Sequence, residues 1–342
     1  MQVRIRAIEY SLPDKVESVA DMAREHPEWP LARIAEKTGV SARRVAAQDQ
    51  TAADIGIDAA QKLFDSGALK PQDVDFLLFC TQTADYILPT TACVIQDRLG
   101  VPSRAGALDF NLGCSGYVYG LGLAKGLIAS EQAERVLLIT ADTYSKLIHP
   151  DDRSVRTVFG DGAAATLIEA SAEAGPDAIG PFVYGTDGRG AANLCVPAGG
   201  MRLPLSAQTS VEYEDHYGNR RAERNLYMNG REIFLFALDT VPGTVHALAE
   251  KAQIDLNEIE CFIFHQASAK VLEALRRRLG IARERFFVSM SDIGNTVSST
   301  IPIALKEAHE SGFIRRGERI MLVGFGVGYS WGATLIRWDP AA

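Results

Sequence analysis

The chain has 342 residues, of which 47% are hydrophobic and 23% are charged, a composition typical of a globular protein with a sizeable core. Its formal net charge is −8 and its basic residues are scattered. This excludes nucleic acid as the main partner, because phosphate binding needs a concentrated basic face.

The N-terminus alternates apolar and charged residues and predicts a strand over residues 1–6. It has no basic-then-apolar signal stretch, and no apolar run in the chain approaches the length of a membrane span. The five cysteines are an odd number without a C-x-x-C pair, so we expect neither a disulfide framework nor a zinc site. We therefore expect a cytoplasmic enzyme without a membrane or nucleic-acid partner.

Short apolar runs bounded by turn residues recur along the chain and predict strands buried on both faces of a sheet, with helices between them. They are Phe76–Cys80, Val136–Thr140, Ala164–Ile168, Cys261–Phe264, Ile320–Val323 and Ala333–Ile336. This alternation predicts the α/β class.

The predicted strands also repeat along the chain. Four pairs of segments resemble each other in the same order, at offsets between 168 and 185 residues: 73–80 with 258–265, 95–101 with 275–281, 135–139 with 319–323, and 165–168 with 333–336. Any single match is weak, but four in order predict two copies of one α/β unit. We place these halves at residues 1–175 and 176–342.

Residues 187–230 form an excursion near the start of the second half. Residues 204–224 are polar and charged, with no sustained period. A loop of this length in a compact domain is usually functional or mobile. A solvated insertion without a role explains the composition equally well.

Residues 109–128 are the most informative stretch. Residues 115–128 are apolar nearly all round and contain four glycines, which predicts a buried helix in close backbone packing. Leu112-Gly113 breaks the chain just before it and places Cys114 at the helix N-terminus. Unpaired N–H groups and the helix dipole there should draw the thiol toward thiolate and hold an oxyanion. A small residue filling a tight turn is the alternative.

Two polar residues of the second half follow predicted structural boundaries. His265 comes directly after the predicted strand 261–264, at the kind of strand end where open α/β sheets build their sites. Asn295 lies in a Gly-Asn turn before small residues that predict another closely packed helix. Taken singly, a structural histidine and a turn or cap asparagine are the simpler explanations.

The duplication brings these residues together. Shifting Cys114 by 180–184 positions lands on residues 294–298, beside Asn295, and His265 is the counterpart of Cys80 at the equivalent strand end. If the halves pack about a pseudo-twofold axis, the loops that hold Cys114 and Asn295 face each other with His265 nearby. We therefore predict one cavity into which the three side chains converge.

At these residues the sequence resembles the thiolase-fold condensing enzymes, and within them the 3-oxoacyl-[acyl-carrier-protein] synthase III family. The resemblance covers nearly the whole chain and is carried by residues 38–44, the segment around Cys114, and residues 152–162, 228–234, 265–267, 294–296 and 324–332. It implies a thiolase-like five-layered αβαβα fold of two duplicated halves, and a homodimer.

The resemblance also implies a mechanism. Cys114 accepts an acyl group from a coenzyme A or carrier-protein thioester, and a malonyl thioester then enters. His265 and Asn295 hydrogen-bond its carbonyl and stabilise the enolate left by carbon dioxide, each donor contributing about 3 kcal/mol. The enolate attacks the acyl-cysteine to form a 3-oxoacyl thioester. No metal or redox cofactor is implied, and acyl carrier protein is the implied partner.

Further family positions imply contacts to the reacting and remote parts of the substrate. The family's second oxyanion hole uses two backbone N–H groups, here those of Cys114 and Val327. Arg153, Lys37 and Lys270 stand where the family has basic residues at the nucleotide end. The family's tryptophan that stacks on adenine has no counterpart, which favours a carrier protein over coenzyme A as acyl donor.

Ile87 and Leu88 replace an aromatic residue that, in the family, often reaches across the dimer into the partner's acyl pocket. These smaller side chains predict an acyl group other than acetyl. The run Arg276-Arg277-Arg278 is either a docking face for an acidic carrier protein or a solvated helix face.

One alternative function stays open, and the residues present disfavour two others. An acyltransferase on the same fold would move the group from Cys114 to a hydroxyl or an amine without decarboxylation. A biosynthetic thiolase would need a second catalytic cysteine near the C-terminal glycine loop, and the sequence has none there. A non-catalytic partner subunit would typically lack the nucleophile, which this chain retains.

Overall fold

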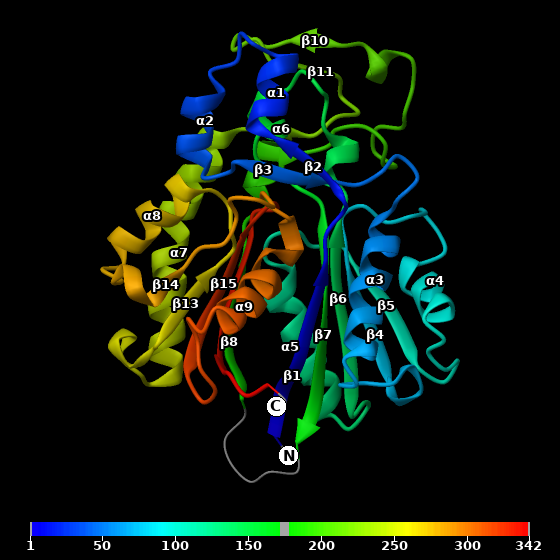
Figure 1. Ribbon diagram of the computed structural model, residues 1–342, viewed down its shortest axis with the longest axis vertical. Helices are drawn as coiled ribbons and strands as arrows, with labels where there is room; N and C mark the ends of the chain where they lie inside the picture. The colour runs from blue at the N-terminus through cyan, green and yellow to red at the C-terminus, as the bar shows by residue number, and fades with distance from the viewer. Residues whose placement is uncertain (1, 172–177, 341–342) are drawn as a thin grey trace.

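The computed structural model describes residues 2–171 and 178–340. Two five-stranded sheets stand side by side and carry helices between them and on their outer faces (Figure 1). The predicted boundary between the halves, at residues 175 and 176, lies outside the described residues.

The two sheets have the same topology. The first has the order β1-β7-β6-β4-β5, built from Gln2–Ser11, Gly162–Ser171, Arg135–Asp142, Phe76–Cys80 and Gly106–Phe110. The second has the order β8-β16-β15-β13-β14, built from Ile179–Thr186, Ser330–Arg337, Arg319–Gly326, Cys261–Phe264 and Phe286–Phe287. In each sheet three strands pair in parallel and the remaining two pairings are antiparallel. All six strands predicted from apolar runs are present.

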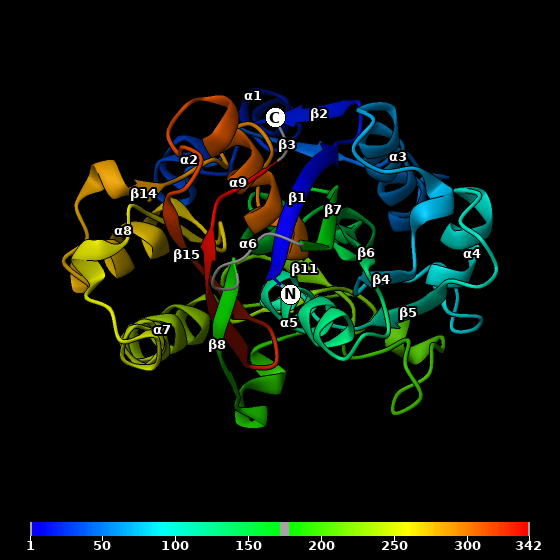
Figure 2. The same ribbon diagram turned by 90° about the horizontal axis from the view of Figure 1, so that it is seen from below.

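Six helices complete the layers. Helices α5 (Gly116–Ala129) and α9 (Thr300–Glu310) lie between the sheets and contact strands of both. Helices α3 (Ala52–Asp65) and α4 (Thr91–Arg98) cover the outer face of the first sheet, while α7 (Gly230–Ala252) and α8 (Ala269–Arg278) lie on the outer side of the second. Figures 1 and 2 show these five layers from two directions, as the predicted αβαβα fold requires.

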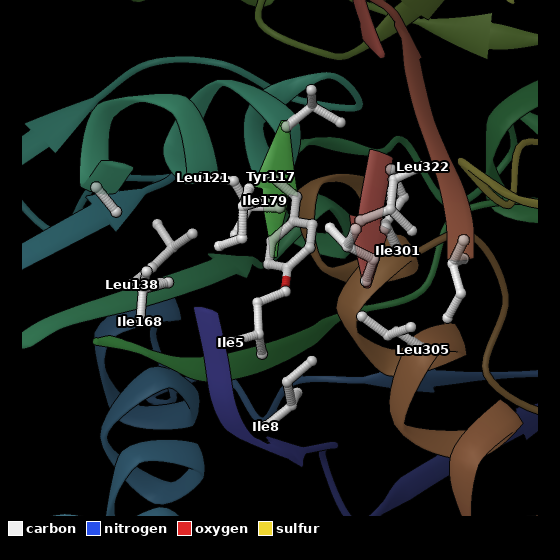
Figure 3. Close-up of a cluster of buried hydrophobic side chains, with 14 of the residues drawn as sticks. Ile5, Ile8, Tyr117, Leu121, Leu138, Ile168, Ile179, Ile301, Leu305 and Leu322 are labelled. Carbon is white, nitrogen blue, oxygen red and sulfur yellow. The ribbon is translucent and has the colours of Figure 1, made fainter. Parts of the chain in front are cut away.

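The central core explains why the first predicted helix is apolar all round. Tyr117 of α5 and Ile301 of α9 are fully buried among Ile5 and Leu138 of the first sheet and Leu322 of the second (Figure 3). Most of α5 packs against one sheet or the other, so apolar residues predominate on it. Glycine in α5 permits close approach: a Cβ at position 120 would lie 2.7 Å from a Leu138 methyl carbon.

Above the layers, short elements from both halves form a cap, seen at the top of Figure 1. The first half contributes β2 (Lys15–Ser18), α1 (Val19–Glu25), α2 (Leu31–Thr38), β3 (Ala42–Val45) and α6 (Arg153–Arg156). The predicted excursion is more ordered than its composition indicates, because it forms two ribbons: β9 (Leu194–Cys195) with β12 (Tyr227–Met228), and β10 (Tyr213–Glu214) with β11 (Arg220–Arg221).

A buried ion pair ties the excursion to the first half. The Arg221 guanidinium lies 2.6 Å from Asp152, whose side chain is fully buried, and 2.8 Å from Asp215. Composition did not reveal this role, because the same charged residues suit a solvated loop.

Helix α7 is, by length and composition, long and apolar enough to cross a membrane, although the sequence was expected to contain no such run. Its Val241, Val245 and Leu248 are fully buried in one cluster with Phe262 and Val323 of the second sheet. Packing on this sheet accounts for the apolar face of the helix.

Removing the buried guanidinium should destabilise the fold. We expect Arg221→Ala to lower the free energy of unfolding by about 3–5 kcal/mol, because it leaves the Asp152 carboxylate buried without its partner. Arg220→Ala is the matched control in the same strand: its exposed pair with Glu212 should contribute about 0–1 kcal/mol. Urea unfolding measures both, and equal losses would contradict the prediction.

Candidate active site

Cys114 lies in the turn between β5 and α5, two residues before the first residue of the helix. Its side chain is buried. The end of β15 passes directly over it: a Cβ at Gly326 would lie 2.7 Å from Sγ of Cys114. The predicted position at a helix start is confirmed, and strand β15 of the second half forms one wall around the sulfur.

His265 and Asn295 approach from the second half. His265 follows β13, Asn295 precedes α9, and both side chains are buried. Nδ2 of Asn295 lies 3.4 Å from Nε2 of His265. The Val297 N–H donates to Oδ1 of Asn295 over 2.9 Å. Because Oδ1 is engaged in this way, the amide nitrogen of Asn295 is the atom that faces the imidazole.

One cavity of about 430 Å³ is lined by Cys114, His265 and Asn295 together. Its other walls are largely apolar and include Phe159, Leu194, Met228, Ile233 and Phe325, so the predicted excursion contributes to it. Lys37, Arg231 and Lys270 also line it. The predicted convergence of three polar side chains on one cavity is therefore present in the structure.

The remaining predicted contacts divide into two groups. Lys37 and Lys270 line the cavity, and the Val327 N–H hydrogen-bonds the Cys114 thiol. Arg153 is not among the described residues that line the cavity; its Nη2 donates to the Tyr217 carbonyl, because the β10–β11 ribbon folds against it.

Ile87 and Leu88 are also absent from the described lining of the cavity. Each is 80% exposed on the surface of this chain. Their predicted place in an acyl pocket therefore requires a second copy of the chain and stays a prediction.

Burial works against the thiolate that was expected at Cys114. The pKa of the Cys114 thiol is raised to about 12, mainly by burial and in smaller part by the nearby Asp142 carboxyl. The hydrogen bond from the Val327 N–H lowers the pKa but does not offset burial. The sequence predicted that Cys114 lies at a helix start, but it did not show how deeply the fold buries the thiol. The thiol must therefore lose its proton as it reacts.

Burial also keeps His265 neutral. It lowers the pKa of the imidazole to about 3, and the backbone of Val297 opposes this only in part. One ring nitrogen therefore carries a hydrogen and the other a lone pair at physiological pH. A neutral imidazole beside a carboxamide is suited to hydrogen-bonding an oxyanion rather than to forming an ion pair.

Sequence reasoning missed two residues that organise this site. Val297 is a buried β-branched residue with φ +55°, a left-handed conformation that costs on the order of 1–3 kcal/mol. Thr300, the first residue of α9, lies 2.7 Å from Nδ1 of His265. The only signal for them was their place in the segment of small residues after Asn295.

Asp142 is a third missed residue. Its carboxyl is fully buried at the end of β6 and accepts hydrogen bonds from the Gln82 N–H over 2.8 Å and from the backbone and hydroxyl of Ser298. It thereby joins the loop after β4 to the loop that holds Asn295. Burial raises its pKa from 3.8 to about 7.

The raised pKa of Asp142 should make stability depend on pH. Between about pH 4 and pH 7 the folded chain holds a proton that the unfolded chain has released, so this carboxyl lowers the free energy of unfolding as pH rises. We expect Asp142→Asn to gain stability relative to the unmodified protein over that range. The exposed Asp58→Asn is the control, and urea unfolding at several pH values measures the trend. A difference that does not change with pH would contradict it.

The close contact at Gly326 yields a second prediction. We expect Gly326→Ala to slow acylation of Cys114 by about 10²-fold, because the new methyl group displaces the sulfur by a fraction of an ångström or more. The control is Gly126→Ala in α5, the helix that follows Cys114, because a Cβ at this position meets nothing within 4 Å. Mass spectrometry of the acylated protein follows the rate, and equal rates for both variants would refute the prediction.

Comparisons with known proteins agree with this geometry. The profile of 3-oxoacyl-[acyl-carrier-protein] synthase III matches residues 108–188, and that of its C-terminal region matches residues 249–338. The β-ketoacyl-[acyl-carrier-protein] synthase III of Caldanaerobacter subterraneus subsp. tengcongensis is 34% identical over 96% of this chain and 95% of its own length. The chain belongs to the 3-oxoacyl-[acyl-carrier-protein] synthase III family.

Solved structures of the family have the same fold. A 3-oxoacyl-(acyl-carrier-protein) synthase III structure superposes with a TM-score of 0.97 at 50% identity, covering 99% of this chain and 100% of the other. The structure of a 3-oxoacyl-(acyl-carrier protein) synthase from Burkholderia xenovorans superposes with a TM-score of 0.91 at 34% identity, covering 99% of this chain and 95% of the other. These likenesses establish the thiolase-like fold and a condensing enzyme of the acyltransferase type.

Proposed function

We propose that the chain condenses an acyl group held on Cys114 with a malonyl thioester, releasing carbon dioxide and forming a 3-oxoacyl thioester. The observation that carries this proposal is the pair of nitrogens from His265 and Asn295, 3.4 Å apart in the cavity that also contains the thiol. Two neutral donors beside a nucleophile match what an enolate intermediate needs.

In the first half-reaction Sγ of Cys114 attacks the carbonyl carbon of an acyl thioester. The backbone N–H groups of Cys114 and Val327 stabilise the oxyanion that forms. The new C–S bond replaces that of the donor, and the thiol proton leaves with the departing thiol. Because burial disfavours a free thiolate, proton loss and attack are coupled.

In the second half-reaction the malonyl thioester takes the place of the released thiol. Its thioester carbonyl accepts hydrogen bonds from His265 and Asn295. The bond to the carboxylate carbon breaks, carbon dioxide leaves, and the electron pair becomes an enolate held by these donors. The enolate carbon attacks the acyl-cysteine carbonyl and forms the new C–C bond. The C–S bond to Cys114 then breaks, and the released thiolate takes a proton from solvent water. These residues supply each step, and we invoke no metal or redox cofactor.

Three cations support a phosphate-bearing substrate. Lys37, Arg231 and Lys270 line the cavity together with the reacting groups, and such cations suit the phosphate of a phosphopantetheine arm. We propose acyl carrier protein as the partner and as the source of at least the malonyl group.

Arg276 and Arg277 both pair with Glu273, which leaves the run at 276–278 less charged than its sequence indicates.

We further propose a homodimer, as the sequence predicted. The support is the exposure of two large apolar side chains, Ile87 and Leu88, in one loop. Burying them against a second copy would remove this apolar surface from water.

Separate assays of the two half-reactions test the function. Cys114→Ala should abolish the mass shift produced by acyl thioesters, whereas Cys93→Ala, at an exposed cysteine, should leave it intact. His265→Ala and Asn295→Ala should each lower carbon dioxide release by about 10²–10³-fold and still accept an acyl group. Acylation without carbon dioxide release by the unmodified protein would instead favour transfer to a hydroxyl or an amine.

A further inference from the structure

The two ring nitrogens of His265 have different neighbours. Nδ1 lies 2.7 Å from the Thr300 hydroxyl, and Nε2 lies 3.4 Å from Nδ2 of Asn295. Thr300 is buried and is not among the described residues that line the cavity. Thr300 therefore acts on the reaction indirectly, through the imidazole or through the Val297 backbone that its hydroxyl also contacts.

We propose that Thr300 is a positioning residue whose hydroxyl donates to Nδ1 of His265 and thereby keeps the ring hydrogen on Nε2, beside Asn295. The inference rests on the proposed function, because stabilising an enolate needs a donor at Nε2. A lone pair at Nε2 would repel the enolate oxygen instead.

The Asn295 carboxamide supports this assignment. Its Oδ1 is engaged by the Val297 N–H, so its NH₂ group faces the imidazole. The separation of 3.4 Å between the two nitrogens exceeds the 2.7–3.2 Å expected for an N–H donor and its acceptor. Two donors that point side by side into the cavity fit this spacing, and an oxygen between them would accept from both.

The Thr300 hydroxyl has one proton and two neighbours. It lies 2.7 Å from Nδ1 of His265 and 3.2 Å from the Val297 carbonyl. The 2.7 Å contact is a hydrogen bond with either atom as donor, and donation by the hydroxyl is the alternative that leaves the ring hydrogen on Nε2. If the proton faced the carbonyl, Nδ1 would have to carry the ring hydrogen, and Nε2 would be left with only a lone pair.

Nuclear magnetic resonance of ¹⁵N-histidine-labelled protein tests the assignment directly. The two-bond ¹H–¹⁵N pattern distinguishes the tautomers, and His265→Ala identifies the signal. We expect the Nε2–H form in the unmodified protein and in Thr300→Ser, and a shift toward the Nδ1–H form in Thr300→Val. Carbon dioxide release should fall about 10- to 100-fold in Thr300→Val and recover in Thr300→Ser, with Cys114 acylation changed less than about twofold.

The outcomes separate this inference from the proposed function. An Nδ1–H form in the unmodified protein, or a Thr300→Val variant with unchanged tautomer and unchanged carbon dioxide release, would overturn the role of Thr300. If Thr300→Val does not fold, the tautomer of the unmodified protein alone decides. Absence of carbon dioxide release from the unmodified protein would defeat the proposed function while leaving the tautomer measurable.

Discussion

The site depends on the way each half of the fold fixes the start of the other half's central helix. Ser115, the residue before α5, shares a hydrogen bond of 2.8 Å with Ser330 of the second sheet. Ser299, the residue before α9, lies 3.0 Å from Thr140 of the first sheet. Both contacts are buried, where an unmade hydrogen bond is costly. Cys114 and Asn295 therefore occupy defined positions because their helices are held from opposite sides.

The sequence allowed much of this arrangement to be predicted. Buried strands are visible as apolar runs, and the ordered internal matches implied two equivalent sheets. The same matches placed Cys114 opposite Asn295, with His265 at the strand end equivalent to Cys80. These inferences succeeded because each needs only local pattern and symmetry, which the chain carries in its residue order.

Other features were out of reach because they arise from contacts between distant segments. The protonation of Cys114 follows from depth of burial, which a helix-start pattern does not encode. Arg153 is held by the Tyr217 carbonyl, since a ribbon about 60 residues later folds against it. The contact between Thr300 and His265 depends on the chain returning to the end of β13 after α8 and β14, 35 positions along the sequence. In each case the sequence gives the position of the residue along the chain but not the groups that surround it in the fold.

The left-handed backbone at Val297 links the two polar side chains of the second half. Its N–H reaches Asn295, and its carbonyl faces the Thr300 hydroxyl that contacts His265. The two amide groups that flank one strained residue thus serve two different functional groups. Because both side chains depend on this one residue, we expect substitutions at Asn295 and His265 to have non-additive effects.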